Sequence, residues 1–415
     1  MSTAVDRIKL AKQASSSIGL ASTQVKNSVL RRIAQLLPDR ESEILAGNAK
    51  DMERAAKDGM TPGLQDRLRL DSQRIASLAK AVLEVVELPD PIGDVIRGRT
   101  LPNGLKLEQV RVPFGVVGAI YEARPNVTID IASLAIKSGN AAVLRGGTAA
   151  EESNKALVKV IQDALSDCGV NANAVQSVDE FGRPGAQAMM QAVGLIDVLI
   201  PRGGHSLIQA VLTESKVPVI ETGEGVVHIF IDETARTDWA EEIILNAKVQ
   251  KIGACNAVET VLVHKAAFDR VMPSVISTLQ VANVTIHGDQ RTFSAFEGVL
   301  KATDEDWATE YLSMDLSIRV VDDMESALDH IAKYSTKHTE AIITEDYSNA
   351  ERFINEVDAA VVMVNASTRF TDGGEFGFGA EVGISTQKMH ARGPMGLPEL
   401  TSTKWIVRGN GHIRA

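Results

Sequence analysis

Gly115-Val-Val-Gly-Ala-Ile120 is a short apolar run with the length and composition of a buried strand. The residues from Ile129 to Lys137 repeat apolar positions with the period of a helix, Gly139-Asn140 ends this pattern, and Ala141-Ala-Val-Leu144 follows as the next strand. A buried strand, a helix and a second buried strand in this order predict two parallel strands joined by a crossover helix. We therefore expect an α/β protein.

The same alternation extends along the chain in two series, and Gly225 separates them. In the first series, further strands are predicted at 174–178, 196–200 and 217–220, with helices at 149–166, 185–192 and 205–214. In the second series, strands are predicted at 226–231, 258–264, 284–287, 316–321, 341–344 and 361–364, with helices at 237–247, 267–280, 324–334 and 348–356. Two such series predict two parallel sheets, each covered by helices on both faces.

Other parts of the chain have other patterns. Apolar positions at helical spacing predict three or four amphipathic helices in residues 1–90. Two strand-like runs in 95–112 flank Asn103-Gly104 and predict a long hairpin with a type I′ turn, and residues 402–407 predict a strand in the tail. Two strands alone are marginally stable. We therefore expect the hairpin to pair with another sheet, in the same chain or in a second subunit.

The composition narrows the class of protein. Hydrophobic residues make up 44% of the 415 residues and charged residues 23%, as in ordinary folded proteins. The net charge of −11 argues against a general nucleic-acid binder and against binding to anionic membranes, because both need a basic surface. Two cysteines cannot form a disulfide framework, the eight histidines have no zinc spacing, and no segment is apolar enough for export or membrane insertion. We expect a cytoplasmic protein without a metal site.

Three glycine-bearing loops follow strands of the first series. They are Arg145-Gly-Gly147, Pro201-Arg-Gly-Gly204 and Glu221-Thr-Gly-Glu-Gly225. Ligands of open parallel sheets bind beyond the carboxyl ends of the strands, so the three loops are expected on one binding edge, which suits a nucleotide. Each loop alone is equally consistent with a simple turn, and none has the G-x-G-x-x-G pattern.

Cys255 has the surroundings of a nucleophile. Small residues flank it in Gly253-Ala-Cys-Asn-Ala257, which leaves room for a substrate carbonyl. The attacking group is a thiolate, so the pKa of about 8.5 for a free thiol must be lowered by cations or oriented N–H groups. Lys248 and Lys251 are the nearby cations in the sequence. The alternative is a buried structural cysteine, and this is our interpretation of Cys168, at the end of a predicted helix.

Several motifs carry a family resemblance that covers essentially the whole chain. The chain resembles the aldehyde dehydrogenase superfamily, and most closely its members that reduce an acyl phosphate. The interval from Glu221 to Cys255 suits that between the family's glutamate and its nucleophile. The remaining matching segments are Val112-Pro-Phe-Gly-Val-Val-Gly-Ala-Ile120, Tyr121-Glu-Ala-Arg-Pro-Asn126, Ser138-Gly-Asn140, Leu144-Arg145, Ile200-Pro-Arg-Gly-Gly204, Thr309-Glu-Tyr-Leu312, Val364-Asn365, Gly374-Glu-Phe-Gly-Phe-Gly379 and Thr386-Gln-Lys-Met-His-Ala-Arg-Gly-Pro-Met-Gly-Leu397.

The resemblance implies an aldehyde dehydrogenase-like α/β fold with two Rossmann-like parallel-sheet domains and a small β flap for oligomerisation. Residues 1–94 and 113–225 would form the dinucleotide-binding domain, and residues 226–375 the catalytic domain that carries the cysteine. Residues 95–112 and 400–415 would form the flap. Pairing of the hairpin and the tail strand between subunits, in a dimer or tetramer, is also implied.

The resemblance also assigns roles to single residues. Cys255 would be the nucleophile, Asn126 a donor to the oxyanion, and Glu310 the carboxylate that holds the nicotinamide ribose. Other residues implied to contact NADP are Arg145, Pro201, Arg202, Gly203, Gly204 and Gly223. Candidate contacts to the anionic groups of the substrate are Arg124, Lys251, His390 and Arg392.

The implied reaction is the NADPH-dependent reduction of L-glutamyl 5-phosphate to L-glutamate 5-semialdehyde, the second step of proline biosynthesis, through a thioester on Cys255. A functional contact with glutamate 5-kinase is a further possibility. The rival enzyme is a hydrolytic aldehyde dehydrogenase with Glu221 as the base. However, Thr222-Gly-Glu-Gly follows Glu221 instead of the family's Leu-Gly-Gly, which weakens this role. The rival from another class is a non-catalytic protein that retains the fold.

Overall fold

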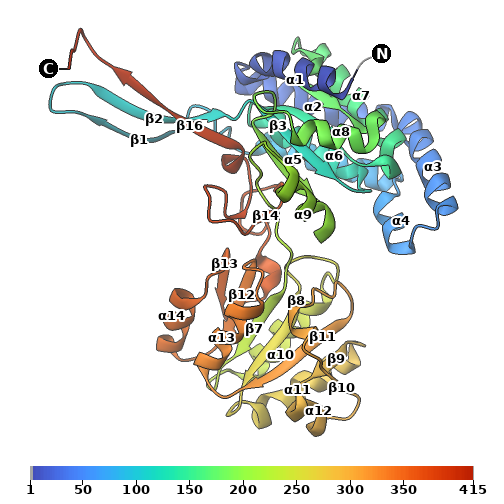
Figure 1. Ribbon diagram of the computed structural model, residues 1–415, viewed down its shortest axis with the longest axis vertical. Coiled ribbons are helices and arrows are strands. Elements are labelled where there is room, and N and C mark those ends of the chain that lie inside the picture. Colours follow the sequence, from blue (N-terminus) through green and yellow to red (C-terminus); the bar gives the residue numbers. More distant parts are fainter. Residues whose placement is uncertain (1–2, 415) are drawn as a thin grey trace. The chain divides into compact units, whose positions relative to one another are not determined.

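The computed structural model describes residues 3–414, and the chain divides into two compact units (Figure 1). The first unit comprises the described residues up to Thr222, together with 377–383 and 395–414. The second unit comprises Gly223–Phe376 and Ile384–Pro394. The Gly- and Pro-rich tail is thus divided between the two units, and residues 384–394 belong to the second unit. Residues 377–383 and 395–414 belong with the first.

A four-stranded parallel sheet forms the centre of the first unit. Its order is β5-β4-β3-β6, where β3 is Val116–Tyr121, β4 Ala141–Arg145, β5 Val175–Ser177 and β6 Val198–Arg202. All six residues of β3 are buried, as its apolar sequence predicts. The helices that accompany the sheet are α6 (Pro125–Lys137), α7 (Glu151–Asp167), α8 (Gly182–Met190) and α9 (His205–Glu214).

The N-terminal region contains five helices, so the prediction of three or four was too low. They are α1 (Ala4–Gly19), α2 (Thr23–Asp39), α3 (Glu41–Lys57), α4 (Pro62–Leu68) and α5 (Ser72–Glu87). The break between α2 and α3 is at Arg40, without a glycine or a following proline. The Arg40 guanidinium contacts the carboxylates of Glu43 and Asp163, at 2.5 and 2.6 Å. The break is thus accompanied by a long-range contact between Arg40 and α7, and local sequence patterns cannot predict such a contact.

The predicted strand 217–220 is wrong. Only an isolated bridge joins Val219 to Leu199 of β6. Pro218 has no N–H, and its carbonyl accepts from the Leu199 N–H at 2.8 Å. The segment therefore lies beside β6 without forming a strand.

Strands β1 (Val95–Thr100), β2 (Lys106–Pro113) and β16 (Thr401–Arg408) form a separate antiparallel sheet of order β1-β2-β16, which we call the flap (Figure 1). The tail strand thus pairs with the hairpin of its own chain, and the expected pairing of these two elements between subunits is corrected. The turn also differs from the predicted type I′. Leu101 and Leu105 close a three-residue loop in which Gly104 alone has a positive φ, of +91°. Pro102, fixed at negative φ, begins this loop.

The second unit contains a seven-stranded parallel sheet of order β10-β9-β11-β8-β7-β12-β13. Neighbouring residues of β7 face opposite layers. Ile229 and Ile231 belong to a core with α10 and α11, and Phe230 to a core with α13 and α14. The strands are β7 (Val227–Ile231), β8 (Val258–His264), β9 (Thr285–Gly288), β10 (Leu300–Lys301), β11 (Asp315–Val321), β12 (Thr339–Ile343) and β13 (Val361–Val364). The helices are α10 (Thr237–Val249), α11 (Phe268–Val281), α12 (Gln290–Ala295), α13 (Met324–Tyr334) and α14 (Tyr347–Glu356).

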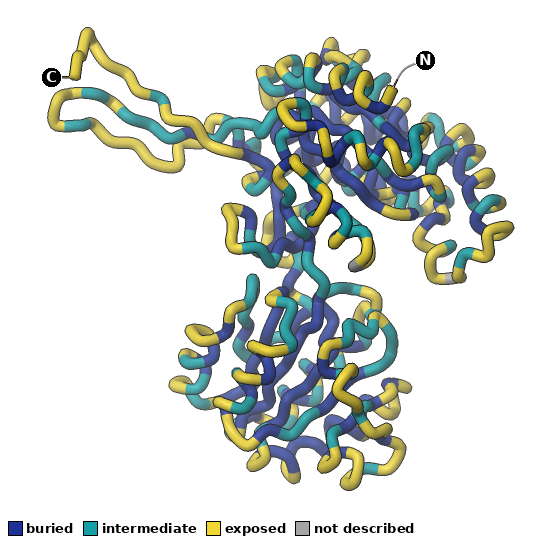
Figure 2. The backbone as a smooth tube through the Cα atoms, viewed as in Figure 1, coloured by how far each residue is buried: buried dark blue, intermediate teal, exposed yellow. Residues whose placement is uncertain are grey.

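Burial follows these layers, since β3, β7 and β12 are buried throughout, whereas β1 is exposed and β2 is mostly half-buried (Figure 2). Two short strands, β14 (Ile384–Ser385) and β15 (Gly393–Pro394), pair in the second unit. Across residues 3–414, none of the helices has both the length and the apolar character needed to cross a bilayer.

Candidate active site

The loop that carries Cys255 joins α10 to β8 and is held through Asn256, the residue after the cysteine. The side-chain amide of the buried Asn256 donates to the Thr371 carbonyl at 2.8 Å. The Thr368 hydroxyl donates to the Asn256 carbonyl at 2.7 Å. Cys255 itself is half-buried. A cysteine on a fixed and partly accessible loop fits a nucleophile better than the structural alternative.

Gly225 brings the cysteine loop and Glu310 together. A Cβ on Gly225 would lie 1.5 Å from the Cys255 carbonyl oxygen, so only glycine permits this approach. The Gly225 N–H also donates to the Glu310 carboxylate at 2.8 Å. Burial raises the pKa of Glu310. The predicted nucleophile and the predicted ribose ligand are therefore neighbours through one backbone position.

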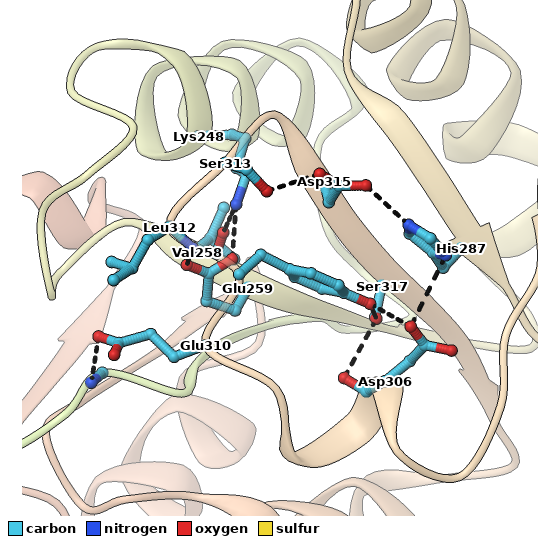
Figure 3. Close-up of polar contacts among 12 residues, drawn as sticks. Lys248, Val258, Glu259, His287, Asp306, Glu310, Leu312, Ser313, Asp315 and Ser317 are labelled. Atoms are coloured by element: carbon cyan, nitrogen blue, oxygen red, sulfur yellow. Dashed lines mark hydrogen bonds and ion pairs between the residues drawn. The ribbon is translucent and has the colours of Figure 1, made fainter. Parts of the chain in front are cut away.

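A buried polar network supports the segment that carries Glu310 (Figure 3). Lys248 and Glu259 are fully buried and form an ion pair at 2.5 Å. Burial raises the pKa of Glu259 to about 7, although Lys248 opposes this shift. The other oxygen of Glu259 accepts from the Leu312 N–H at 3.3 Å, and Leu312 has a φ of +51°, which is strained for a side chain of this kind. Lys248 is thus committed to Glu259, so our expectation that it acts on the thiol is corrected.

Arg369 is a cation on a segment tied to the cysteine loop, since its carbonyl accepts from the Asn256 side-chain amide at 3.4 Å, and the sequence analysis missed it. Burial lowers the pKa of Arg369, while the negative charges of Asp372, Cys255 and Glu375 oppose this shift. Its Nε donates to the Gln250 side-chain oxygen at 2.8 Å. Arg369 follows Cys255 by more than a hundred residues, so no local pattern could connect the two.

The predicted cofactor loops of the first unit lie at one edge of its sheet. Ile120 of β3 is in register with Arg145 on one side and Pro201 on the other, and Tyr121 is in register with Arg202. The carboxyl ends of three strands therefore present these residues together. Gly203 and Gly204 follow and are exposed. A Cβ on Gly203 would lie 2.9 Å from the Glu122 carboxylate, the end of a flexible side chain.

Arg145 is held near a buried carboxylate, yet part of its guanidinium lacks a partner. Its buried Nε has no hydrogen-bond partner among the described residues. The loop that follows is fixed by Asp179, which accepts from the Gly146 N–H at 2.6 Å and from the Asn154 amide at 2.9 Å. Burial raises the pKa of Asp179 to about 6. An orphaned guanidinium N–H beside two glycines is suited to an anionic oxygen.

Asn126 lies in the first turn of α6, after Arg124 at the N-terminal end of the helix. Its side-chain amide donates to the Asp130 carboxylate at 3.1 Å. Burial raises the pKa of Asp130 to about 6, although the positive charge of Arg202 opposes this shift. The amide of Asn126 is thus oriented by a carboxylate one turn along the helix.

The remaining predicted residues fall in both units. Glu221 is half-buried in the first unit. In the second, Gly223 contacts Thr386, since a Cβ there would lie 2.4 Å from the Thr386 methyl group. Lys251 and His390 are exposed. Arg392 forms an ion pair with Asp358 at 2.7 Å, and Lys388 binds the same carboxylate at 2.8 Å. Arg392 as a substrate contact stays a prediction, and Asp358 is the partner that the sequence did not reveal.

The second unit thus gathers Cys255, Glu310, Lys251, His390, Arg392 and Gly223. The first unit carries Asn126, Arg124, Arg145, Glu221 and the 201–204 loop. Within residues 3–414, no group of histidine, cysteine and carboxylate side chains is arranged to hold a metal ion.

Comparison with known proteins agrees with this geometry. The model of the aldehyde dehydrogenase family matches residues 2–295. A curated relative, the gamma-glutamyl phosphate reductase of Leifsonia xyli subsp. xyli, is 61% identical over 410 residues, covering 99% of this chain and 97% of the relative. A second, from Clavibacter michiganensis subsp. michiganensis, is 57% identical and covers 98% of this chain and 94% of the relative.

Solved structures give the same picture. The crystal structure of gamma-glutamyl phosphate reductase from Thermotoga maritima matches with a TM-score of 0.97 and 44% identity over 100% of both chains. An acetylating aldehyde dehydrogenase from Geobacillus thermoglucosidasius matches with a TM-score of 0.71 at 16% identity, over 99% of this chain and 97% of that one. The second likeness concerns the fold alone, and it agrees with the predicted aldehyde dehydrogenase-like architecture.

Proposed function

Because the chain belongs to the aldehyde dehydrogenase family, and its near full-length relatives are gamma-glutamyl phosphate reductases, we propose that it reduces L-glutamyl 5-phosphate to L-glutamate 5-semialdehyde in proline biosynthesis. It is an oxidoreductase. The aldehyde is the product of the proposed reduction and the substrate of the reverse reaction. One observation supports the proposal independently of the similarity to known reductases. The loop of Cys255, the Glu310 carboxylate and the Arg369 cation meet in one unit.

In the proposed mechanism the Cys255 thiolate attacks the acyl carbon of the substrate. A carbon–sulfur bond forms, the carbon–oxygen bond to phosphate breaks, and phosphate leaves with the electron pair. A backbone N–H beside Cys255 stabilises the oxyanion, and a second donor role for Asn126 stays a prediction from the family resemblance. The nicotinamide cofactor, when bound, supplies the hydride that reduces the thioester carbon as the sulfur leaves. The positive charge of Arg369 favours the thiolate before and after this step.

The residues present fit a nicotinamide cofactor, and NADP is our proposal for its identity. Glu310 would hold a ribose. Arg145, with its orphaned buried Nε, lies at the edge with the 201–204 loop and would bind a 2′-phosphate. A guanidinium can make two charge-assisted hydrogen bonds to such a group, and NAD offers none.

This assignment predicts the effect of Arg145→Ala. The variant should weaken NADP more than NAD, by about tenfold or more in Kd, since each charge-assisted hydrogen bond contributes roughly 1.5–3 kcal/mol. Titration of both oxidised cofactors by calorimetry measures it. Equal losses for the two cofactors would instead make Arg145 a structural residue of the loop.

The fate of the thioester separates this enzyme from the hydrolytic alternative. If phosphate resolves it, oxidation of glutamate 5-semialdehyde depends on phosphate, and Glu221→Gln keeps most of kcat because no water must be deprotonated. If water resolves it, Glu221 is the base and its loss lowers kcat by about 10²–10⁴-fold. We expect the first result from a phosphate titration of the wild type and the variant. Full turnover without phosphate, lost in Glu221→Gln, would leave the hydrolytic enzyme.

The proposal extends to the setting of the enzyme. We propose a cytoplasmic homo-oligomer, a dimer or tetramer, that acts on a small-molecule substrate. A functional contact with glutamate 5-kinase would limit exposure of the reactive acyl phosphate to water. Mixing the two purified proteins in analytical ultracentrifugation tests this contact.

A further inference from the structure

A polar cavity of about 200 Å³ lies in the second unit, between the end of α10 and the segment that follows β13. Its lining combines one guanidinium, two carboxylates, two carboxamides and one aromatic ring, from Arg369, Asp372, Glu375, Asn246, Gln250 and Phe370. Both signs of charge therefore line a small space. Such a combination suits the zwitterionic end of an amino acid, where an ammonium group and a carboxylate are attached to the same carbon.

The cavity adjoins the nucleophile. The carbonyl of Arg369, one of its walls, accepts from the side-chain amide of Asn256, the residue after Cys255, at 3.4 Å. The backbone around Arg369 is fixed to the cysteine loop, because the Asn256 amide donates to the Thr371 carbonyl and the Thr368 hydroxyl donates to the Asn256 carbonyl. The Arg369 side chain is itself oriented by its hydrogen bond to Gln250. The cysteine loop and the segment that lines the cavity are thus held together.

We propose that this cavity binds the amino-acid end of the substrate, with Arg369 on the α-carboxylate and Asp372 and Glu375 on the α-ammonium. The inference rests on the proposed function. In glutamyl 5-phosphate only three carbon–carbon bonds separate the acyl carbon from the α-carbon, so both charged groups must lie beside the nucleophile. The proposal therefore gives a binding site to the α-carboxylate and α-ammonium groups, which do not react.

The charges disfavour the other anion of the reaction. Phosphate carries two negative charges near neutral pH, and two carboxylates in the lining against one guanidinium would repel it. An α-carboxylate brings its own ammonium group, which those carboxylates attract. The two carboxamides can donate to the carboxylate or accept from the ammonium group.

The test separates recognition of the two charged groups from chemistry at the sulfur. We would measure the KM for glutamate 5-semialdehyde, the KM for phosphate and the KM for NADP in oxidation, with Arg369→Gln, Arg369→Lys and the double variant Asp372→Asn/Glu375→Gln. 5-Oxopentanoate, which lacks only the ammonium group, serves as a second substrate. The alkylation rate of Cys255 by iodoacetamide, in a Cys168→Ser background, reports the reactivity of the sulfur directly.

We expect Arg369→Gln to raise the KM for both aldehydes by about tenfold or more and Arg369→Lys to recover part of this loss. The double variant should raise the KM for glutamate 5-semialdehyde by a similar factor and leave that for 5-oxopentanoate within about twofold. The KM values for phosphate and NADP should stay near those of the wild type. Glu351→Gln, an exposed carboxylate of α14, is the matched control and should change nothing.

Three results would overturn the inference. Unchanged KM values for both aldehydes would show that the cavity does not bind the substrate. A rise in the KM for phosphate alone would make Arg369 a phosphate contact. An alkylation rate that falls in step with turnover in Arg369→Gln, while the KM for both aldehydes stays at the wild-type value, would make Arg369 act only on the sulfur. Wild-type protein without phosphate-dependent turnover of glutamate 5-semialdehyde would instead refute the proposed function itself.

Discussion

The two cysteines have opposite surroundings, which predicts opposite effects of replacing them. Cys168 caps the C-terminus of α7, where burial and the neighbouring Asp167 raise its pKa. Cys255 lies on a loop with Arg369 nearby. Cys255→Ala should abolish turnover in both directions and leave NADPH binding nearly intact, whereas Cys168→Ala should be close to neutral. Activity assays and cofactor titrations of both variants measure this. More than a trace of activity in Cys255→Ala, or its loss in Cys168→Ala, would contradict the assignment.

At the scale of single residues, the sequence gives the identity of the nucleophile but misleads about its electrostatics. Lys248 precedes Cys255 by seven positions (255 − 248) and is, with Lys251, one of the two cations that the sequence offers. It lies on the buried side of α10 and pairs with Glu259. Arg369, a cation from the segment after β13, is tied to the cysteine loop through Asn256, and only the fold brings it there. Contacts between residues so far apart in the sequence cannot be predicted from the period of the hydrophobic pattern or from local composition.

At the scale of elements, the Lys248–Glu259 pair connects α10, β8 and the loop of Glu310 (Figure 3). Glu259→Gln leaves a buried ammonium group without its counter-charge, and we expect the free energy of unfolding to fall by about 3–5 kcal/mol. The KM for NADPH should also rise, because Leu312 and then Glu310 lose their support. Adding Lys248→Met should recover much of the stability, since no buried charge is left alone. Chemical denaturation of the single and double variants, with cofactor titrations, measures both effects.

The outcome of this cycle distinguishes the pair's two roles. If the double variant regains stability but not NADPH affinity, the pair positions the Glu310 loop as well as filling the interior. If Glu259→Gln changes neither stability nor affinity, the pair contributes nothing measurable and our account of the loop is wrong.

Elements with a strong period were predicted closely from the sequence, and those defined by distant contacts were not. The strands 258–264 and 361–364 and the helix 324–334 have the bounds that their patterns predict. The break at Arg40, the non-strand at Pro218 and the turn before Gly104 depend on an ion pair, a missing N–H and a fixed φ. For the site, the carboxyl-end rule brings Arg145 and the 201–204 loop to one edge. It could not reveal the cavity beside Arg369.

At the scale of the whole molecule, the flap has two edges without strand partners among the described residues, on β1 and β16. Val95, Ile96, Trp405 and Val407 expose 47–57% of their surface there. Exposed edges with apolar side chains favour association unless something covers them. We propose that a second copy of the chain covers the flap, although β16 already pairs within its own chain.

This predicts a dimer or larger assembly at assay concentrations and its dissociation by charges on the flap. Ile96→Asp/Val407→Asp should shift the molar mass from light scattering to that of one chain, because each buried carboxylate would need a partner that the interface does not offer. Both substituted side chains are exposed within one chain, so circular dichroism should show both units still folded. Leu20→Asp, an exposed apolar residue after α1, is the control and should not alter the mass. A wild-type monomer under the same conditions would remove the idea, whereas a dimer that survives the double substitution would place the interface elsewhere.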